Sequence, residues 1–133
     1  MNQHVWAYFA VGLGGGLGAV SRMALSRLVD SRCETFPLGT LIVNVSGCLL
    51  MGILHALSQP EGRLVIDPVW RQFLFIGILG GYTTFSSFSV QTLSLAQDGE
   101  WIYAALNILL SFVLCLVGVW LGSLSGQAIN NWR

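Results

Sequence analysis

Hydroxyl and aromatic side chains are concentrated in one short stretch of an otherwise apolar segment. Residues 80–89 read Gly-Gly-Tyr-Thr-Thr-Phe-Ser-Ser-Phe-Ser, with five serine or threonine hydroxyls and two phenylalanines. A membrane helix can be interrupted at mid-depth only where protein or a water-filled cavity receives the freed backbone groups. A helix break, hydroxyl groups and aromatic rings at one depth indicate an ion or substrate site, and the other segments must supply its walls.

The polar groups that we place at membrane depth are amides and hydroxyls, which can donate hydrogen bonds to an anion. The edge of a phenyl ring is electropositive, and Phe85 and Phe88 share a face of a helix. Ring edges and donors together offer a small anion a partial replacement for water, and such weak binding is what conduction requires. The candidate polar residues are Asn44, Thr84, Ser86, Ser87, Ser89, Asn107 and Ser111.

Two of these polar side chains lie on predicted helices outside the 80–89 stretch. Asn44 shares a helical face with Gly47, Cys48 and Met51. It is either a hydrogen-bonding contact between helices or an amide donor that faces a polar path. Asn107 and Ser111 lie one turn apart and form a second polar stripe.

The predicted break at Gly80–Thr83 frees backbone carbonyls for a second use. If two antiparallel copies cross at this point, four carbonyls could meet on the axis between them. Such a group would suit one small hard cation, because hard cations take oxygen ligands.

The composition indicates a membrane protein. The chain has 133 residues, 54% of them hydrophobic and only 9% charged, whereas soluble domains carry about 25% charged residues. Each of four apolar stretches, at residues 5–28, 38–58, 70–96 and 101–124, exceeds the roughly 20 residues that span a bilayer. We therefore expect a single domain over residues 1–133, an all-α membrane protein with four transmembrane helices and the third broken near its middle.

The arginines give the chain no preferred orientation. The chain has no lysine, and with four spans its arginines divide equally between the two sides, Arg22, Arg27 and Arg32 on one and Arg63, Arg71 and Arg133 on the other. Because the positive-inside rule depends on an asymmetry of Lys and Arg, we expect insertion both ways up. Oppositely oriented copies would then pair as an antiparallel, dual-topology homodimer.

The acidic residues all fall in loops or at span ends, at Asp30, Glu34, Glu61, Asp67, Asp98 and Glu100. Proton-coupled transporters need an ionisable relay group within the membrane. This pattern disfavours the main alternative, a small dual-topology multidrug/proton antiporter. A scaffold subunit without transport activity would explain the glycine-rich packing faces but not the polar stretch at 83–89.

The remaining features are the glycines, Arg22 and the cysteines. Gly12/Gly16, Gly14/Gly18 and the series Gly118, Gly122 and Gly126 have the small-residue spacing that lets membrane helices approach closely. Arg22 either extends to the interface or places a positive charge at a pore mouth. The cysteines, Cys33, Cys48 and Cys115, have no metal-binding spacing, which favours packing or a loop thiol.

Three motifs give the chain a family resemblance. Gly18-Ala19-x-x-Arg22, Gly39-Thr40-Leu-x-x-Asn44-x-x-Gly47 and Gly80-Gly81-x-Thr83-Thr84-Phe85-Ser86-x-Phe88-Ser89 resemble the Fluc (CrcB-type) fluoride channel family over all four spans. The resemblance implies an antiparallel homodimer in the bacterial inner membrane with two fluoride pores, which exports fluoride passively. It implies a channel and not an enzyme, with no catalytic residues, and the partners are fluoride, a second copy and the bilayer, with no nucleic acid.

The resemblance also implies roles for individual residues. Phe85 and Phe88 correspond to the pore phenylalanines, Asn44 to the pore asparagine and Arg22 to the vestibule arginine. The carbonyls of Gly80 and Thr83 correspond to ligands of a central structural Na⁺. Ser86, Ser87 and Ser89 correspond to the hydroxyl track, where many members have Ser-Thr in place of Ser86-Ser87. Several members have tyrosine at the position of Asn107, which can still donate.

Overall fold

The computed structural model describes residues 3–31 and 35–132, and within these ranges it is helical and contains no strand. Four helical segments in these ranges are long and apolar enough to cross a membrane: Val5–Asp30, Leu38–Leu57, Pro68–Gln97 and Trp101–Asn131. This confirms the predicted all-helical, four-span architecture. The last span extends seven residues beyond its expected end at residue 124.

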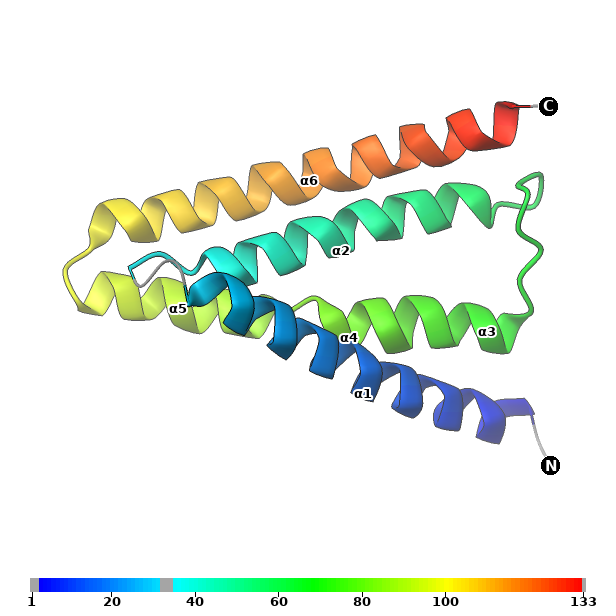
Figure 1. Ribbon diagram of the computed structural model, residues 1–133, viewed down its shortest axis with the longest axis horizontal. Coiled ribbons are helices and arrows are strands. Elements are labelled where there is room, and N and C mark those ends of the chain that lie inside the picture. The colour runs from blue at the N-terminus through cyan, green and yellow to red at the C-terminus, as the bar shows by residue number, and fades with distance from the viewer. Residues whose placement is uncertain (1–2, 32–34, 133) are drawn as a thin grey trace.

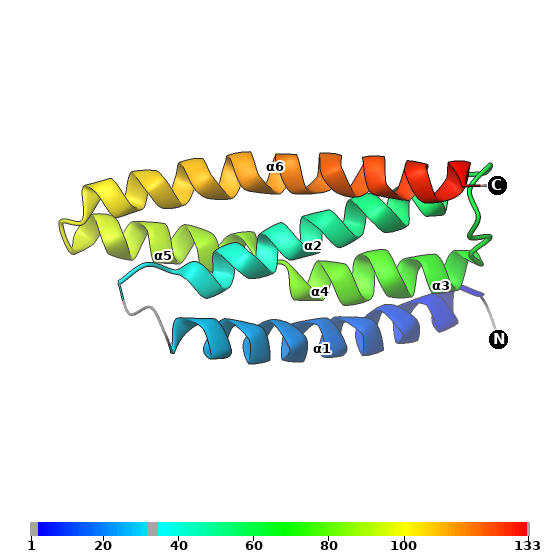
Figure 2. The ribbon, with the colours of Figure 1, turned by 45° about the horizontal axis from the view of Figure 1, so that its top comes forward.

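The spans lie side by side along the long axis of the molecule (Figures 1 and 2). The first two spans are α1 (Gln3–Asp30) and α2 (Leu38–Leu57), and the fourth is α6 (Trp101–Asn131). The third comprises α3 (Pro68–Gln72), the π-helix η1 (Phe73–Leu79), α4 (Gly80–Tyr82) and α5 (Phe85–Gln97). Both ends of the chain and the 58–67 connection lie at one end of the bundle, as four spans require (Figure 1).

Glycines bring the spans into close contact in two places. On α6, Gly122 and Gly126 lie against the α2 backbone, where a Cβ at Gly126 would come within 2.7 Å of the Ile53 carbonyl oxygen. On α1, Gly14 lies against η1, where a Cβ would come within 2.7 Å of the Phe73 carbonyl oxygen. These contacts confirm the predicted packing roles of Gly14/Gly18 and of the series on α6. The same prediction for Gly12/Gly16 is wrong, because both positions face open space.

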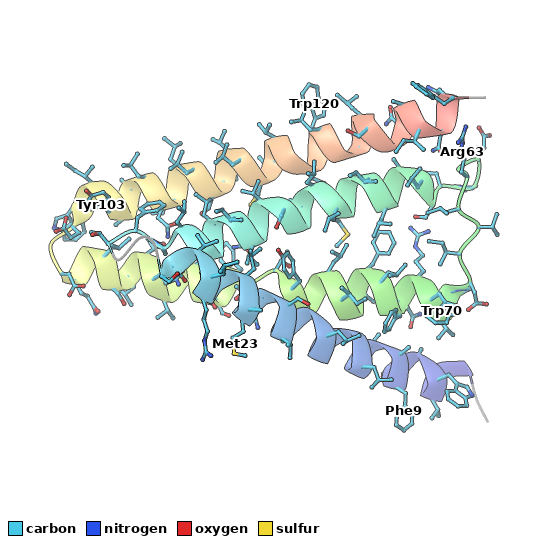
Figure 3. All side chains as sticks on the ribbon, viewed as in Figure 1. Phe9, Met23, Arg63, Trp70, Tyr103 and Trp120 are labelled. Atoms are coloured by element: carbon cyan, nitrogen blue, oxygen red, sulfur yellow. The ribbon has the colours of Figure 1, made fainter. Side chains whose placement is uncertain are left out.

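Large apolar side chains cover the outside of the bundle, and Phe9 and Trp120 point away from it (Figure 3). Trp70 and Tyr103 lie toward opposite ends of the molecule, where aromatic residues gather at membrane interfaces. The largest fully buried side chains are only Val43 and Asn107 among the residues that the structure describes. An apolar exterior around a small buried core is typical of a multi-pass membrane protein.

The break in the third span falls later than the sequence predicts. Gly80 and Gly81 are helical in α4, and the chain is extended at Thr83 (ψ 154°) and Thr84 (ψ 115°). The two glycines therefore do not make the break. Gly81 instead permits close packing against α1, because a Cβ there would lie 2.6 Å from the Gly15 carbonyl oxygen.

Candidate functional site

The break is held open by a side chain from a neighbouring helix. The Asn44 amide on α2 donates from Nδ2 to the Thr84 carbonyl oxygen at 3.0 Å and accepts at Oδ1 from the Thr84 N–H at 2.8 Å. Thr84 is buried, so its peptide group would otherwise lose its partners away from water. Asn44 thus replaces the helical hydrogen bonds of the extended residue. Its amide nitrogen carries two hydrogens, which leaves one for a ligand.

Two carbonyls on the α4 side of the break have lost their helical donors. In a continuous helix, the Gly80 carbonyl would accept from the N–H of Thr84 and the Thr83 carbonyl from the N–H of Ser87. The Thr84 N–H donates to Asn44 instead, and the Ser87 N–H donates to Thr84 Oγ1 at 3.2 Å. The Gly80 and Thr83 carbonyls are therefore among those that the break releases.

The hydroxyls after the break organise the start of α5. Thr84 is the N-cap, a position where threonine is favoured because its side chain satisfies a free helical N–H. Its Oγ1 also lies 3.2 Å from Ser86 Oγ and donates to Ser87 Oγ at 3.1 Å. Ser89 is exposed and donates to the Phe85 carbonyl oxygen at 2.9 Å. The pattern Thr-x-x-Ser was a signal for a helix start that the sequence interpretation missed.

Phe85 and Phe88 lie together beside a cavity. Their ring centroids are 5.2 Å apart with the planes inclined at 48°, so the predicted shared face is correct. Both line a cavity of about 500 Å³ between α2, the break, α5 and α6, together with Asn44 and Ser111. Phe85 is 79% exposed on the single chain.

Asn107 does not join this cavity. It is buried between α5 and α6, where its Nδ2 donates to Thr92 Oγ1 at 2.8 Å, and Thr92 Oγ1 donates to the Phe88 carbonyl oxygen at 2.8 Å. The contact fixes the α5 turn that carries Phe88. Thr92, four residues after Phe88 and able to bond its carbonyl, is a contributor that the sequence interpretation missed.

Arg22 lies apart from these groups. It is half-buried on α1 and does not line the cavity that holds Asn44 and Phe85. The structure therefore brings together Asn44, Thr83, Thr84, Phe85, Phe88 and Ser111 around one cavity. Ser86, Ser87 and Ser89 follow along α5, while Asn107 supports that helix from behind.

These features define a class, a small multi-pass membrane protein with a broken span and a largely apolar cavity at the break. The family model described as "CrcB-like protein, Camphor Resistance (CrcB)" matches residues 9–123, and the chain belongs to this family. It is 49% identical over 124 residues to a "Fluoride-specific ion channel FluC" from Rhodospirillum rubrum, covering 92% of this chain and 96% of the relative. A protein of the same name from Opitutus terrae is 50% identical over 127 residues, covering 95% and 96%.

Proposed function

We propose that this chain is a fluoride channel, and not an enzyme, that lets fluoride leave the bacterial cytoplasm passively. The observation that carries the proposal is the pairing of the Phe85 and Phe88 rings with Asn44 at one cavity beside the break. We infer that the anion is fluoride from the name of the similar proteins, "Fluoride-specific ion channel FluC". The amide and the ring edges replace part of the water around a small anion without a fixed positive charge that would hold it.

The antiporter alternative fits this arrangement less well. The only carboxylate in the described parts of the four spans is Asp30, at the last residue of α1. It accepts a hydrogen bond from the Gly39 N–H at 2.8 Å and so ties the end of α1 to the start of α2. A proton relay needs an ionisable group at depth, whereas the polar groups around the break are neutral.

The working unit in this proposal is an antiparallel homodimer with two pores in the bacterial inner membrane. Gly80, Ser86 and Ser89 are exposed on a single chain, although they lie near the middle of a membrane span. Lipid cannot satisfy a backbone carbonyl that has lost its helical donor. A second copy crossing at the break would cover these groups, and the equal division of arginines permits the opposite orientation.

A structural Na⁺ between the two copies also fits the residues of the break. The N–H groups that would bond the Gly80 and Thr83 carbonyls in a continuous helix bond Asn44 and Thr84 side chains instead. Two copies would supply four such oxygens, and carbonyl oxygen is a ligand type that hard cations accept. The ion would neutralise these dipoles and hold the copies together at the crossing point.

Efflux from liposomes loaded with fluoride or chloride tests the proposed function. We expect rapid fluoride release from reconstituted protein and no comparable chloride release. Protein that elutes as a single homogeneous species and yet releases no fluoride would exclude the channel. Fluoride release that requires a proton gradient would favour the antiporter.

Removal of Na⁺ tests the cation separately. After prolonged exchange into Na⁺-free buffer we expect activity to fall and to return when Na⁺ is restored. Unchanged efflux, or a high-resolution structure with water between the Gly80 and Thr83 carbonyls, would exclude a structural sodium ion. Neither result would bear on fluoride conduction itself.

A further inference from the structure

Two cysteines that the family motifs do not include face each other across the cavity wall. Cys48 on α2 and Cys115 on α6 both line the cavity that holds Phe85 and Phe88, and both are half-buried. The helices are in close contact here, because a Cβ at Gly118, one turn beyond Cys115, would lie 3.7 Å from Cys48 Cβ.

The cavity wall has two levels of different chemistry. Asn44 precedes Cys48 by four residues on α2, and Ser111 precedes Cys115 by four residues on α6. One level therefore carries an amide and a hydroxyl, and the next carries two sulfurs about 6 Å further along the helices. Met51, three residues after Cys48, adds a thioether on the same wall.

We propose that Cys48 and Cys115 form a binding site for a soft, thiol-seeking metal cation, with Met51 as a weaker third donor. Thiolate and thioether ligands select soft metals, and oxygen-preferring ions such as Na⁺ would not compete for them. Binding of a divalent soft ion forms two metal–sulfur bonds and releases both thiol protons to the buffer, with no change in oxidation state. In this proposal Cys48 and Cys115 bind a metal ion in addition to the packing role that the sequence favours.

An ion at this site would also obstruct fluoride movement, an inference that rests on the proposed function. The two sulfurs open onto the same space as the phenylalanine rings and Asn44. A large ion bound there occupies volume next to the rings and draws in the side chains that ligate it. Soft metals would thus inhibit this channel through residues that belong to this chain and not to the family motifs.

The test uses Hg²⁺ and the full-length protein with Cys33→Ser, which removes the third cysteine. We expect one Hg²⁺ per chain to survive desalting against an excess of a monothiol. We expect this retained ion to be lost in the further variants Cys48→Ser and Cys115→Ser, which are close in size to the original residues. Met51→Leu should keep the ion but release it faster to the competitor.

A second measurement does not depend on the folding of the Cys48→Ser and Cys115→Ser variants. In the Cys33→Ser protein, one equivalent of Hg²⁺ should protect both remaining thiols from a membrane-permeant maleimide in a single step. No retained Hg²⁺, retention of one ion by either serine variant, or protection of one thiol alone would overturn the two-thiol site.

Fluoride efflux with and without Hg²⁺ then tests obstruction. We expect efflux from the Cys33→Ser protein to be lost on addition of Hg²⁺, and the Cys33→Ser/Cys48→Ser/Cys115→Ser protein to be unaffected by it. One bound ion with undiminished efflux would overturn the obstruction. If the untreated protein carries no fluoride, the proposed function fails, and the Hg²⁺ stoichiometry still decides the metal site.

Discussion

The double hydrogen bond between Asn44 and Thr84 predicts the outcome of Asn44→Ala. The substitution removes the 2.8 Å and 3.0 Å bonds. It leaves the backbone N–H and the carbonyl of the buried Thr84 without partners. Side-chain hydrogen bonds between membrane helices contribute about 0.6 kcal/mol on average and about 1.7 kcal/mol at most. Two bonds to the backbone of one residue therefore stabilise the extended break by about 1–3 kcal/mol.

Amide hydrogen exchange in detergent micelles measures this stabilisation at the residue concerned. A loss of about 1–3 kcal/mol corresponds to exchange at the Thr84 N–H that is about 5- to 150-fold faster. Fluoride efflux should fall as well, because Asn44 both holds the break and lines the cavity.

Ser46→Ala is the matched control. It also removes two side-chain hydrogen bonds of the same helix, the 2.9 Å contact between Ser46 Oγ and Tyr82 Oη and the 3.1 Å bond from Ser46 Oγ to the Val43 carbonyl oxygen. It leaves both bonds of the Thr84 backbone intact. We expect exchange at Thr84 to stay near the parent rate in this variant. Equal exchange in Asn44→Ala, Ser46→Ala and the parent would refute the assignment of Asn44 as the support of the break.

Three further predictions concern helix packing, the phenylalanine rings and Asn107. Gly18→Ala should destabilise the folded protein in detergent, because a Cβ there falls on the Ile78 carbonyl oxygen, whereas Gly16→Ala should be tolerated because that position is open; thermal unfolding with both variants checks this. Phe85→Ile and Phe88→Ile should strongly reduce fluoride efflux while size-exclusion elution stays unchanged, and retained efflux in both would remove the ring-edge argument. Asn107→Leu should lose the 2.8 Å bond to Thr92 and lower the free energy of unfolding by about 1 kcal/mol, measured by chemical denaturation.

The four spans could be predicted because apolar length alone requires them, but the end of the last helix could not. Residues 125–131 read Ser-Gly-Gln-Ala-Ile-Asn-Asn, which lacks the apolar character of a span. The helix continues because Asn130 donates to the Ala56 carbonyl oxygen at 2.9 Å and accepts from the Arg63 N–H at 3.0 Å. These contacts join residues more than 60 positions apart, so local pattern does not reveal them.

The position of the break shows a second limit of sequence reasoning. Because glycine commonly interrupts helices, the glycine pair at 80–81 led to the prediction of a break at Gly80–Thr83. In the structure these glycines serve close packing against α1, and the break follows where Thr84 can cap α5 and Asn44 can bond the extended peptide. The Gly80 and Thr83 carbonyls that the family resemblance implies as sodium ligands are among those that lose helical donors, because a break frees the carbonyls on the side that precedes it. Their role as sodium ligands stays a prediction.

The hydrogen bonds also narrow the set of donors that an anion could meet. The Thr83 hydroxyl donates to the Leu79 carbonyl oxygen at 3.0 Å, and the Thr84 hydroxyl is shared with Ser87. At the cavity, the remaining donors are the second N–H of Asn44 and the hydroxyl of Ser111. Two neutral donors replace only part of the water around a small anion, so the electropositive ring edges must supply a large share of the rest. If the chain conducts fluoride as proposed, we therefore expect selectivity for a small anion to depend most on the paired phenylalanines.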